Sequence, residues 1–135
     1  MRQMPFTWSE AEGELELEIT APDEQALFAE GFEAMRGLLG GGAPETAVTR
    51  EVELAGNDRA ALLADFLAEL AILADTEGLV PERMSRLELS DEGLRATVEG
   101  TRGDPPVRVK GATYERLAFE QAASGWLARA VFIRG

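Results

Sequence analysis

The sequence predicts an α+β fold: a two-layer sandwich in which two helices pack on one face of a single sheet of about six strands, mostly antiparallel or mixed. Three observations favour it, namely a long apolar helical stripe within 57–78, strict alternation at 14–20, and the element order strand, helix, strand, helix, then only strands. With 135 residues, of which 45% are hydrophobic, the chain is expected to form one domain over residues 1–135.

The central element is a helix expected between Asn57 and Gly78. Its large apolar side chains recur at steps of three and four, so they share one broad face: Leu62, Leu63, Phe66, Leu70 and Leu73. Asn57 is a suitable N-cap, and Gly78 is a suitable C-terminal stop. Because burying each large aliphatic side chain contributes roughly 1.5–3 kcal/mol, this face must be covered, most plausibly by a sheet.

The other elements follow in order along the chain. Residues 14–20 alternate between glutamate and Leu or Ile, which is typical of a half-buried strand. Asp23 is expected to cap a helix that runs to about Leu39 and ends at a glycine triplet. Further strands are expected at 46–54, 84–89, 94–100, 107–112, 114–119 and 126–133, with a bend near 113 and a proline loop at 103–106.

Composition excludes most familiar catalytic chemistry. The chain has no cysteine and no histidine, so thiolate and imidazole ligands and a histidine general base are impossible. No nucleotide-binding loop or nucleophile–base arrangement is present, and we therefore expect no enzyme activity. A small hydrolase that uses Asp75 and Glu77 is the weakest alternative.

The charge of the chain bears on its partners. A formal net charge of −12 argues against direct binding of nucleic acid or of an anionic membrane, and it fits either solubility alone or a basic protein partner. The first residues lack the apolar run of a signal peptide, and no stretch approaches a membrane span of about 20 apolar residues. A cytoplasmic location is the expectation.

Three segments of the second half share their order and spacing with segments of one known family. They are LADTEGL at 73–79, VKGATYE at 109–115 and GWLARAVFI at 125–133. Together they resemble the archease family, small cytoplasmic proteins that assist the GTP-dependent RNA ligase joining tRNA exons. The resemblance implies an archease-like fold and a non-catalytic, accessory role in tRNA processing.

The resemblance also implies a divalent-ion site, and here the sequence departs from the family. The family places one aspartate on the first strand and another near the C-terminus. Alignment without gaps puts Glu14 at the first aspartate, two inserted residues would instead favour Glu12, and Arg134 stands at the second. A guanidinium repels a cation, by roughly 4 kcal/mol at about 4 Å and an effective dielectric near 20. We therefore expect a weak or lost metal site, no cofactor, and Arg134 turned toward Glu14 or Glu12 or out to solvent.

Six further residues are candidates for binding. From the family-like segments these are Lys110, Thr113 and Tyr114, and from the end of the central helix they are Asp75, Thr76 and Glu77. Lys110 either contacts a partner or pairs with a glutamate at 12, 14 or 16. Acidic residues in a last helical turn oppose the helix dipole, so they should have compensating partners, or hydrogen bonds that make their role structural.

The expected function is therefore that of an archease-like accessory protein for an RNA ligase. The alternative is a metal-free protein-interaction or chaperone-like module that keeps the fold without a ligase partner. The partner's identity, the nucleotide dependence and the oligomeric state stay open at this point.

Overall fold

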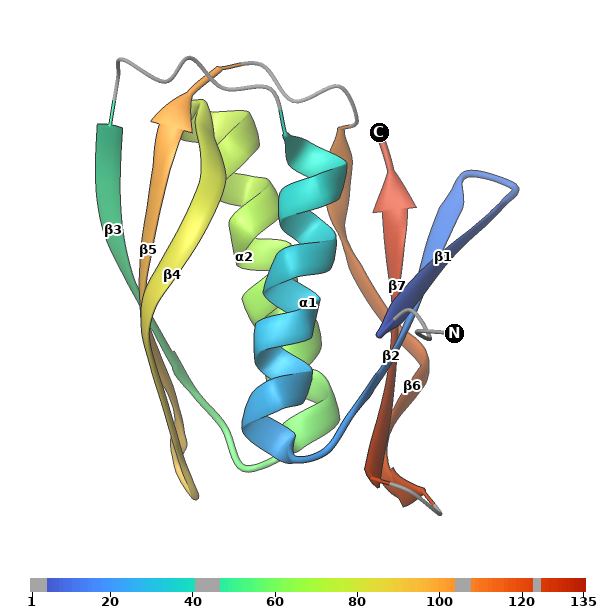
Figure 1. The fold of residues 1–135 in the computed structure, drawn as a ribbon. Coiled ribbons are helices and arrows are strands. Elements are labelled where there is room, and N and C mark those ends of the chain that lie inside the picture. The colour runs from blue at the N-terminus through green and yellow to red at the C-terminus, as the bar shows by residue number, and fades with distance from the viewer. Residues whose placement is uncertain (1–4, 41–46, 104–107, 123–124) are drawn as a thin grey trace.

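The computed structural model describes residues 5–40, 47–103, 108–122 and 125–135. Within these residues, two helices lie between two antiparallel sheets, as Figure 1 shows. One sheet has the strand order β1-β2-β7-β6 and the other has the order β3-β5-β4. The elements are β1 (Phe6–Ala11), β2 (Glu14–Ala21), α1 (Glu24–Leu39), β3 (Ala47–Ala55), α2 (Arg59–Glu77), β4 (Leu79–Ser90), β5 (Gly93–Arg102), β6 (Val109–Ala122) and β7 (Gly125–Arg134).

The α+β class is confirmed, but the strands form two sheets where one was expected. The reason lies in α2, whose buried residues include the neighbours Leu62, Leu63 and Ala64 as well as Phe66 and Leu67. Successive residues of a helix point about 100° apart, so these side chains extend well beyond a single stripe. One sheet covers only part of such a surface. Both helices accordingly contact both sheets, which makes three layers.

The helix ends follow local capping chemistry. Asp23 caps α1 as expected, because its Oδ1 accepts a hydrogen bond of 2.8 Å from the backbone N–H three residues later. The cap of α2 is Asp58 and not Asn57, since Asp58 Oδ1 accepts from the second and third N–H groups of the helix at 3.0 and 3.2 Å. Gly78 ends α2 with a left-handed φ of 67°, as expected.

Strand β1 was not expected from the sequence. It pairs antiparallel with β2 through a tight turn at Glu12 and Gly13, whose φ angles are 50° and 80°. Two residues with positive φ are typical of the two-residue turns that join strands of a hairpin. Trp8 anchors this edge strand, with its ring centroid 6.0 Å from that of Phe132 on β7.

Strand β6 replaces the two shorter strands expected at 107–112 and 114–119. Its register with β7 shifts between Thr113 and Ala118, at the place of the expected bend. Arg116 within this irregular stretch has a φ of 63°. The expected loop at 103–106 lies mostly outside the described residues.

A chain of aromatic contacts runs from the helices into the four-stranded sheet, within a core that is otherwise mostly aliphatic. The ring centroids of Phe28 on α1 and Phe66 on α2 lie 6.4 Å apart, and Phe28 is 6.0 Å from Phe119 on β6. Phe119 in turn lies 5.7 Å from Trp126 on β7. Tilted pairs at these separations add to the apolar burial. The core therefore joins both helices to the four-stranded sheet.

The outer face of the three-stranded sheet is covered by ion pairs. Arg83 pairs with Glu99 at 2.7 Å, and Arg86 pairs with Glu88 at 2.6 Å. The hydrogen bond from each arginine lowers the pKa of its glutamate below the ordinary value.

Among the described residues, neither helix has the length and apolar character needed to cross a membrane.

Two glycines provide a matched test of the packing of β4 on β5. A Cβ at Gly100 would lie 2.2 Å from the carbonyl oxygen of Val80, whereas a Cβ at the exposed helical Gly37 would meet nothing within 4 Å. Gly100→Ala should lower the free energy of unfolding by about 1–3 kcal/mol, because backbone must shift. Gly37→Ala should raise it by roughly 0.5–1 kcal/mol. Urea denaturation measures both, and a neutral Gly100→Ala would contradict this strand pairing.

Candidate functional site

Most of the predicted site residues gather at one end of the molecule, where α2 ends (Figure 1). Backbone hydrogen bonds join the segments there: Arg134 N donates to Gly13 O at 2.9 Å, and Gly103 N donates to Gly78 O at 2.8 Å. Gly135 N also donates to Arg108 O at 2.9 Å, and Arg108 lies 3.0 Å from Asp75 in the last turn of α2. The end of β7 thus lies beside both the β1–β2 turn and the residue before β6, and that residue contacts α2. We call this region the α2 C-terminal end and describe it residue by residue.

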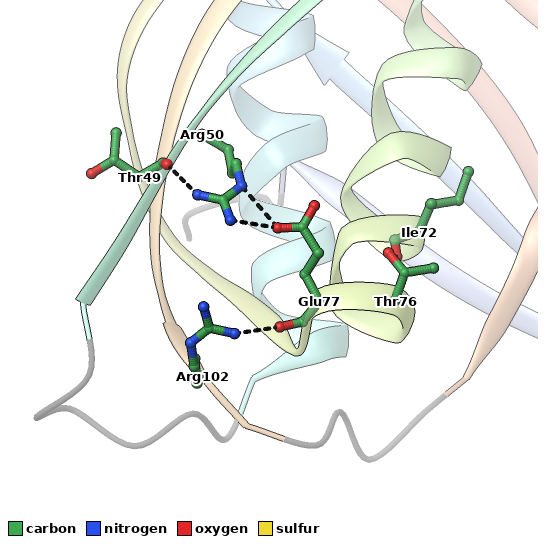
Figure 2. Close-up of polar contacts among 6 residues, drawn as sticks. All are labelled: Thr49, Arg50, Ile72, Thr76, Glu77 and Arg102. Atoms are coloured by element: carbon green, nitrogen blue, oxygen red, sulfur yellow. Dashed lines mark hydrogen bonds and ion pairs between the residues drawn. The ribbon is translucent and has the colours of Figure 1, made fainter.

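Two arginines of the three-stranded sheet hold the last residue of α2 (Figure 2). The Glu77 carboxylate accepts from Arg50 Nε at 2.8 Å and lies 2.6 Å from Arg50 Nη2. Arg102 Nη1 donates to the backbone oxygen of Glu77 at 2.9 Å. The carbonyls that end a helix lack partners and carry partial negative charge, so cations stabilise them. These contacts fasten the end of α2 to β3 and β5.

The other two acidic-turn candidates also have partners. Asp75 Oδ1 lies 3.0 Å from Nε of Arg108, just before β6, although both side chains are largely exposed. Thr76 Oγ1 donates a 2.7 Å hydrogen bond to Ile72 O within the helix (Figure 2). The expectation that these residues need compensating partners is confirmed. A direct role in partner binding stays a prediction.

The candidates on β6 are arranged differently. Lys110 is exposed, and the methylene stem of its side chain lies beside Gly135. Within the described part of the chain, Lys110 forms no ion pair with the glutamates at 12, 14 and 16, two of which pair with Arg116 and Arg129 instead. The expected pairing of Lys110 with one of these glutamates is therefore wrong. Thr113 is partly buried opposite Val131 on β7. The side chain of Tyr114 lies outside the described residues.

Arg134 does not contact the glutamates that the sequence suggested. Its Nη1 lies 2.5 Å from Glu10 Oε1, while the carboxylate of Glu14 is held by Arg116 Nη2 at 2.6 Å. Glu12 is exposed in the β1–β2 turn. The expected orientation of Arg134 toward Glu14 or Glu12 is therefore corrected to Glu10.

The strand register explains this correction. Glu14 lies directly opposite Ile133, so these two side chains share the outer face of the four-stranded sheet. Arg134, one residue later, points to the other face. Glu10 lies opposite the buried Leu15 and so shares the face of Arg134. Comparison with the family's sequence pattern shows which positions correspond, but it does not show on which face of the sheet each side chain lies.

These residues do not fit the divalent cation that the resemblance implies. Hard cations need several oxygen ligands, and Glu10 and Glu14 are each engaged by a guanidinium. Among the residues that the structure describes, no three Asp, Glu, His or Cys side chains are grouped so that they could hold a metal ion. The loss of the ion itself stays a prediction.

Five residues at or near this end were missed by sequence reasoning, namely Glu10, Arg50, Arg102, Arg108 and Arg116. Each is an ordinary charged residue in or beside a strand, and its partner comes from a distant segment. The weak signal available was the acidic last turn of the central helix, which called for cations without identifying them.

The fold and this end together define a small α+β domain whose candidate site consists of ion pairs, without histidine or cysteine. A model of the Archease protein family matches residues 6–132. The chain therefore belongs to the archease family, as the resemblance implied.

Individual relatives agree with this assignment. Protein archease of Pyrococcus abyssi is 35% identical over 96 residues, which cover 64% of this chain and 68% of that protein. Protein archease of Thermococcus gammatolerans is 35% identical over 91 residues, covering 61% and 64%. The matched segment thus spans about two thirds of these relatives.

Two solved structures share the fold. The solution structure of protein 1598 of Methanobacterium thermoautotrophicum has a TM-score of 0.72 at 22% identity and covers 97% of this chain and 99% of that one. The crystal structure of a Thermotoga maritima protein, described as an archease and possible chaperone, has a TM-score of 0.62 at 19% identity, with coverage of 99% and 96%. The expected archease-like fold is confirmed.

The ion prediction is tested by calorimetric titration. Calcium, magnesium and manganese added to the protein should give no heat above that of dilution, because guanidinium groups already engage the carboxylates at 10 and 14. A matched titration of a calcium-binding protein controls for sensitivity. A micromolar dissociation constant would show that other ligands rebuild the site.

The hold on the end of α2 is tested by Arg50→Ala. This variant removes the partner of the Glu77 carboxylate at the negative end of the helix, so the free energy of unfolding should fall by about 0.5–1 kcal/mol at low salt. Arg83→Ala, which removes a more exposed pair on the outer sheet face, should cost less than about 0.5 kcal/mol. Equal losses in urea denaturation would mean that the helix end gains nothing from Arg50.

Proposed function

We propose that this protein is an accessory protein that binds a GTP-dependent RNA ligase and assists it in tRNA processing. The observation that carries the proposal is the match to the archease family over residues 6–132. The protein supplies no catalytic group of its own in this role, and a cytoplasmic location belongs to the same proposal.

The α2 C-terminal end is the surface we propose for the partner. Lys110 is exposed, and Arg108 is 71% exposed although it lies beside Asp75. These cations sit among carboxylates in a chain of net charge −12. A mixed surface of this kind suits a protein that offers both carboxylates and basic groups, whereas a polyphosphate backbone would be repelled by the chain as a whole.

The alternative is a chaperone-like or interaction module without a ligase partner. Its support is the similarity in fold to the Thermotoga maritima protein, which is described as a possible chaperone. The two functions differ in whether an RNA ligase responds to the protein.

Affinity capture from the source organism, followed by mass spectrometry, tests the partner. An RNA ligase should be enriched with the unmodified protein. Capture of the ligase should fall about three- to tenfold with Lys110→Glu, because the new carboxylate repels the partner carboxylate that Lys110 attracts. Arg86→Glu is the matched control, since Arg86 lies on the outer face of the three-stranded sheet.

A purified RNA ligase from the same organism then tests the assistance itself. Its multiple-turnover ligation rate should rise when the protein is added. An unchanged rate, with no RNA-processing protein captured, would contradict the accessory role and leave the interaction module.

A further inference from the structure

Arg129 of β7 binds Glu18 on the neighbouring strand β2 at 3.2 Å, and two further arginines bind the β1–β2 hairpin across an intervening strand. Arg116 on β6 binds Glu14 on β2 at 2.6 Å, and Arg134 at the end of β7 binds Glu10 on β1 at 2.5 Å. The strand order is β1-β2-β7-β6, so each pair passes over one intervening strand. Each of these two ion pairs therefore links two strands that share no backbone hydrogen bonds with each other.

Arg116 reaches Glu14 because β6 is irregular at this point. The register with β7 shifts between Thr113 and Ala118, and Arg116 itself has a φ of 63°. A non-glycine residue with positive φ is uncommon and needs support from its surroundings. Arg116, Glu14 and Val131 of β7 line the same small hollow, and Val131 is fully buried although it lies on the outer face of the sheet.

Arg134 makes the corresponding link on the opposite face. It follows Ile133, which lies opposite Glu14, so its side chain points to the face that carries Glu10. The two arginines thus hold the hairpin from both sides of the sheet. Together the two pairs connect all four strands: β1 with β7, and β2 with β6.

We propose that Arg116 and Arg134, as fixed cations of the chain, hold the β1–β2 hairpin by binding its carboxylates, in place of the divalent ion that the family resemblance implies there. The resemblance places Arg134 at the family's second aspartate, and it places Glu14, or Glu12 if two residues are inserted, at the first. A dissolved cation would gather several carboxylates around one centre, whereas here each carboxylate receives its own planar guanidinium.

The consequence is a hairpin whose order is independent of divalent ions. A side-chain cation neither dissociates nor yields to a chelator, and its pair weakens only through screening by salt. This inference concerns the chain itself and does not depend on an RNA ligase being the partner. It adds Arg116, which neither alignment nor spacing identified, to the residues that shape this end of the molecule.

Hydrogen exchange of the backbone amides in residues 6–21 tests the proposal. In the unmodified protein, exchange should be the same, within about twofold, in millimolar calcium and in excess chelator. In the double variant Arg116→Gln/Arg134→Gln, the same amides should exchange about three- to tenfold faster, because two exposed ion pairs are lost. The amides of α2 should keep their exchange rates. The control Arg83→Gln/Arg86→Gln removes two exposed pairs from the other sheet.

The single substitutions separate the two links. Arg116→Gln should loosen mainly β2, and Arg134→Gln should loosen mainly β1. Calcium that slows exchange in the unmodified hairpin would overturn the proposal, since a bound ion would then be ordering the hairpin. Hairpin rates in the double variant equal to those of the control would overturn it as well.

Discussion

The burial of α2 on two sides is the constraint on which the rest of the structure depends. Phe66, Leu67 and Leu70 of this helix are completely buried. No single sheet covers so wide a surface, so the strands divide into two sheets with the helices between them. This arrangement fixes where α2 ends, and the polar groups at that end then determine the candidate site.

Local patterns in the sequence predicted most of the helices and strands but not their assembly into two sheets. The alternation that predicted β2 and the cap that predicted α1 depend on neighbouring residues, and both are present in the structure. Strand β1 is short and lies at a sheet edge, with outer residues such as Thr7 and Ser9 exposed, so its pattern is weak. The division into two sheets depends on pairings such as that of β2 with β7, which are more than a hundred residues apart.

The same limit explains the outcome at the candidate site. The acidic last turn of α2 signalled a need for cations, and Arg50, Arg102 and Arg108 supply them from three segments. The pairing of Arg134 was missed because the face of a strand on which a side chain lies changes with each residue, and the register is set by long-range contacts. Arg116 adds a backbone irregularity that no propensity indicates.

Guanidinium groups bind the carboxylates of Glu10 and Glu14, at the place where the family resemblance implies an ion. A crystal structure from manganese-containing solution, with anomalous scattering recorded, tests this claim most directly. It should show Arg134 on Glu10 and Arg116 on Glu14, with no anomalous peak near either carboxylate. A peak there, with both carboxylates turned toward it and both arginines displaced, would contradict the claim.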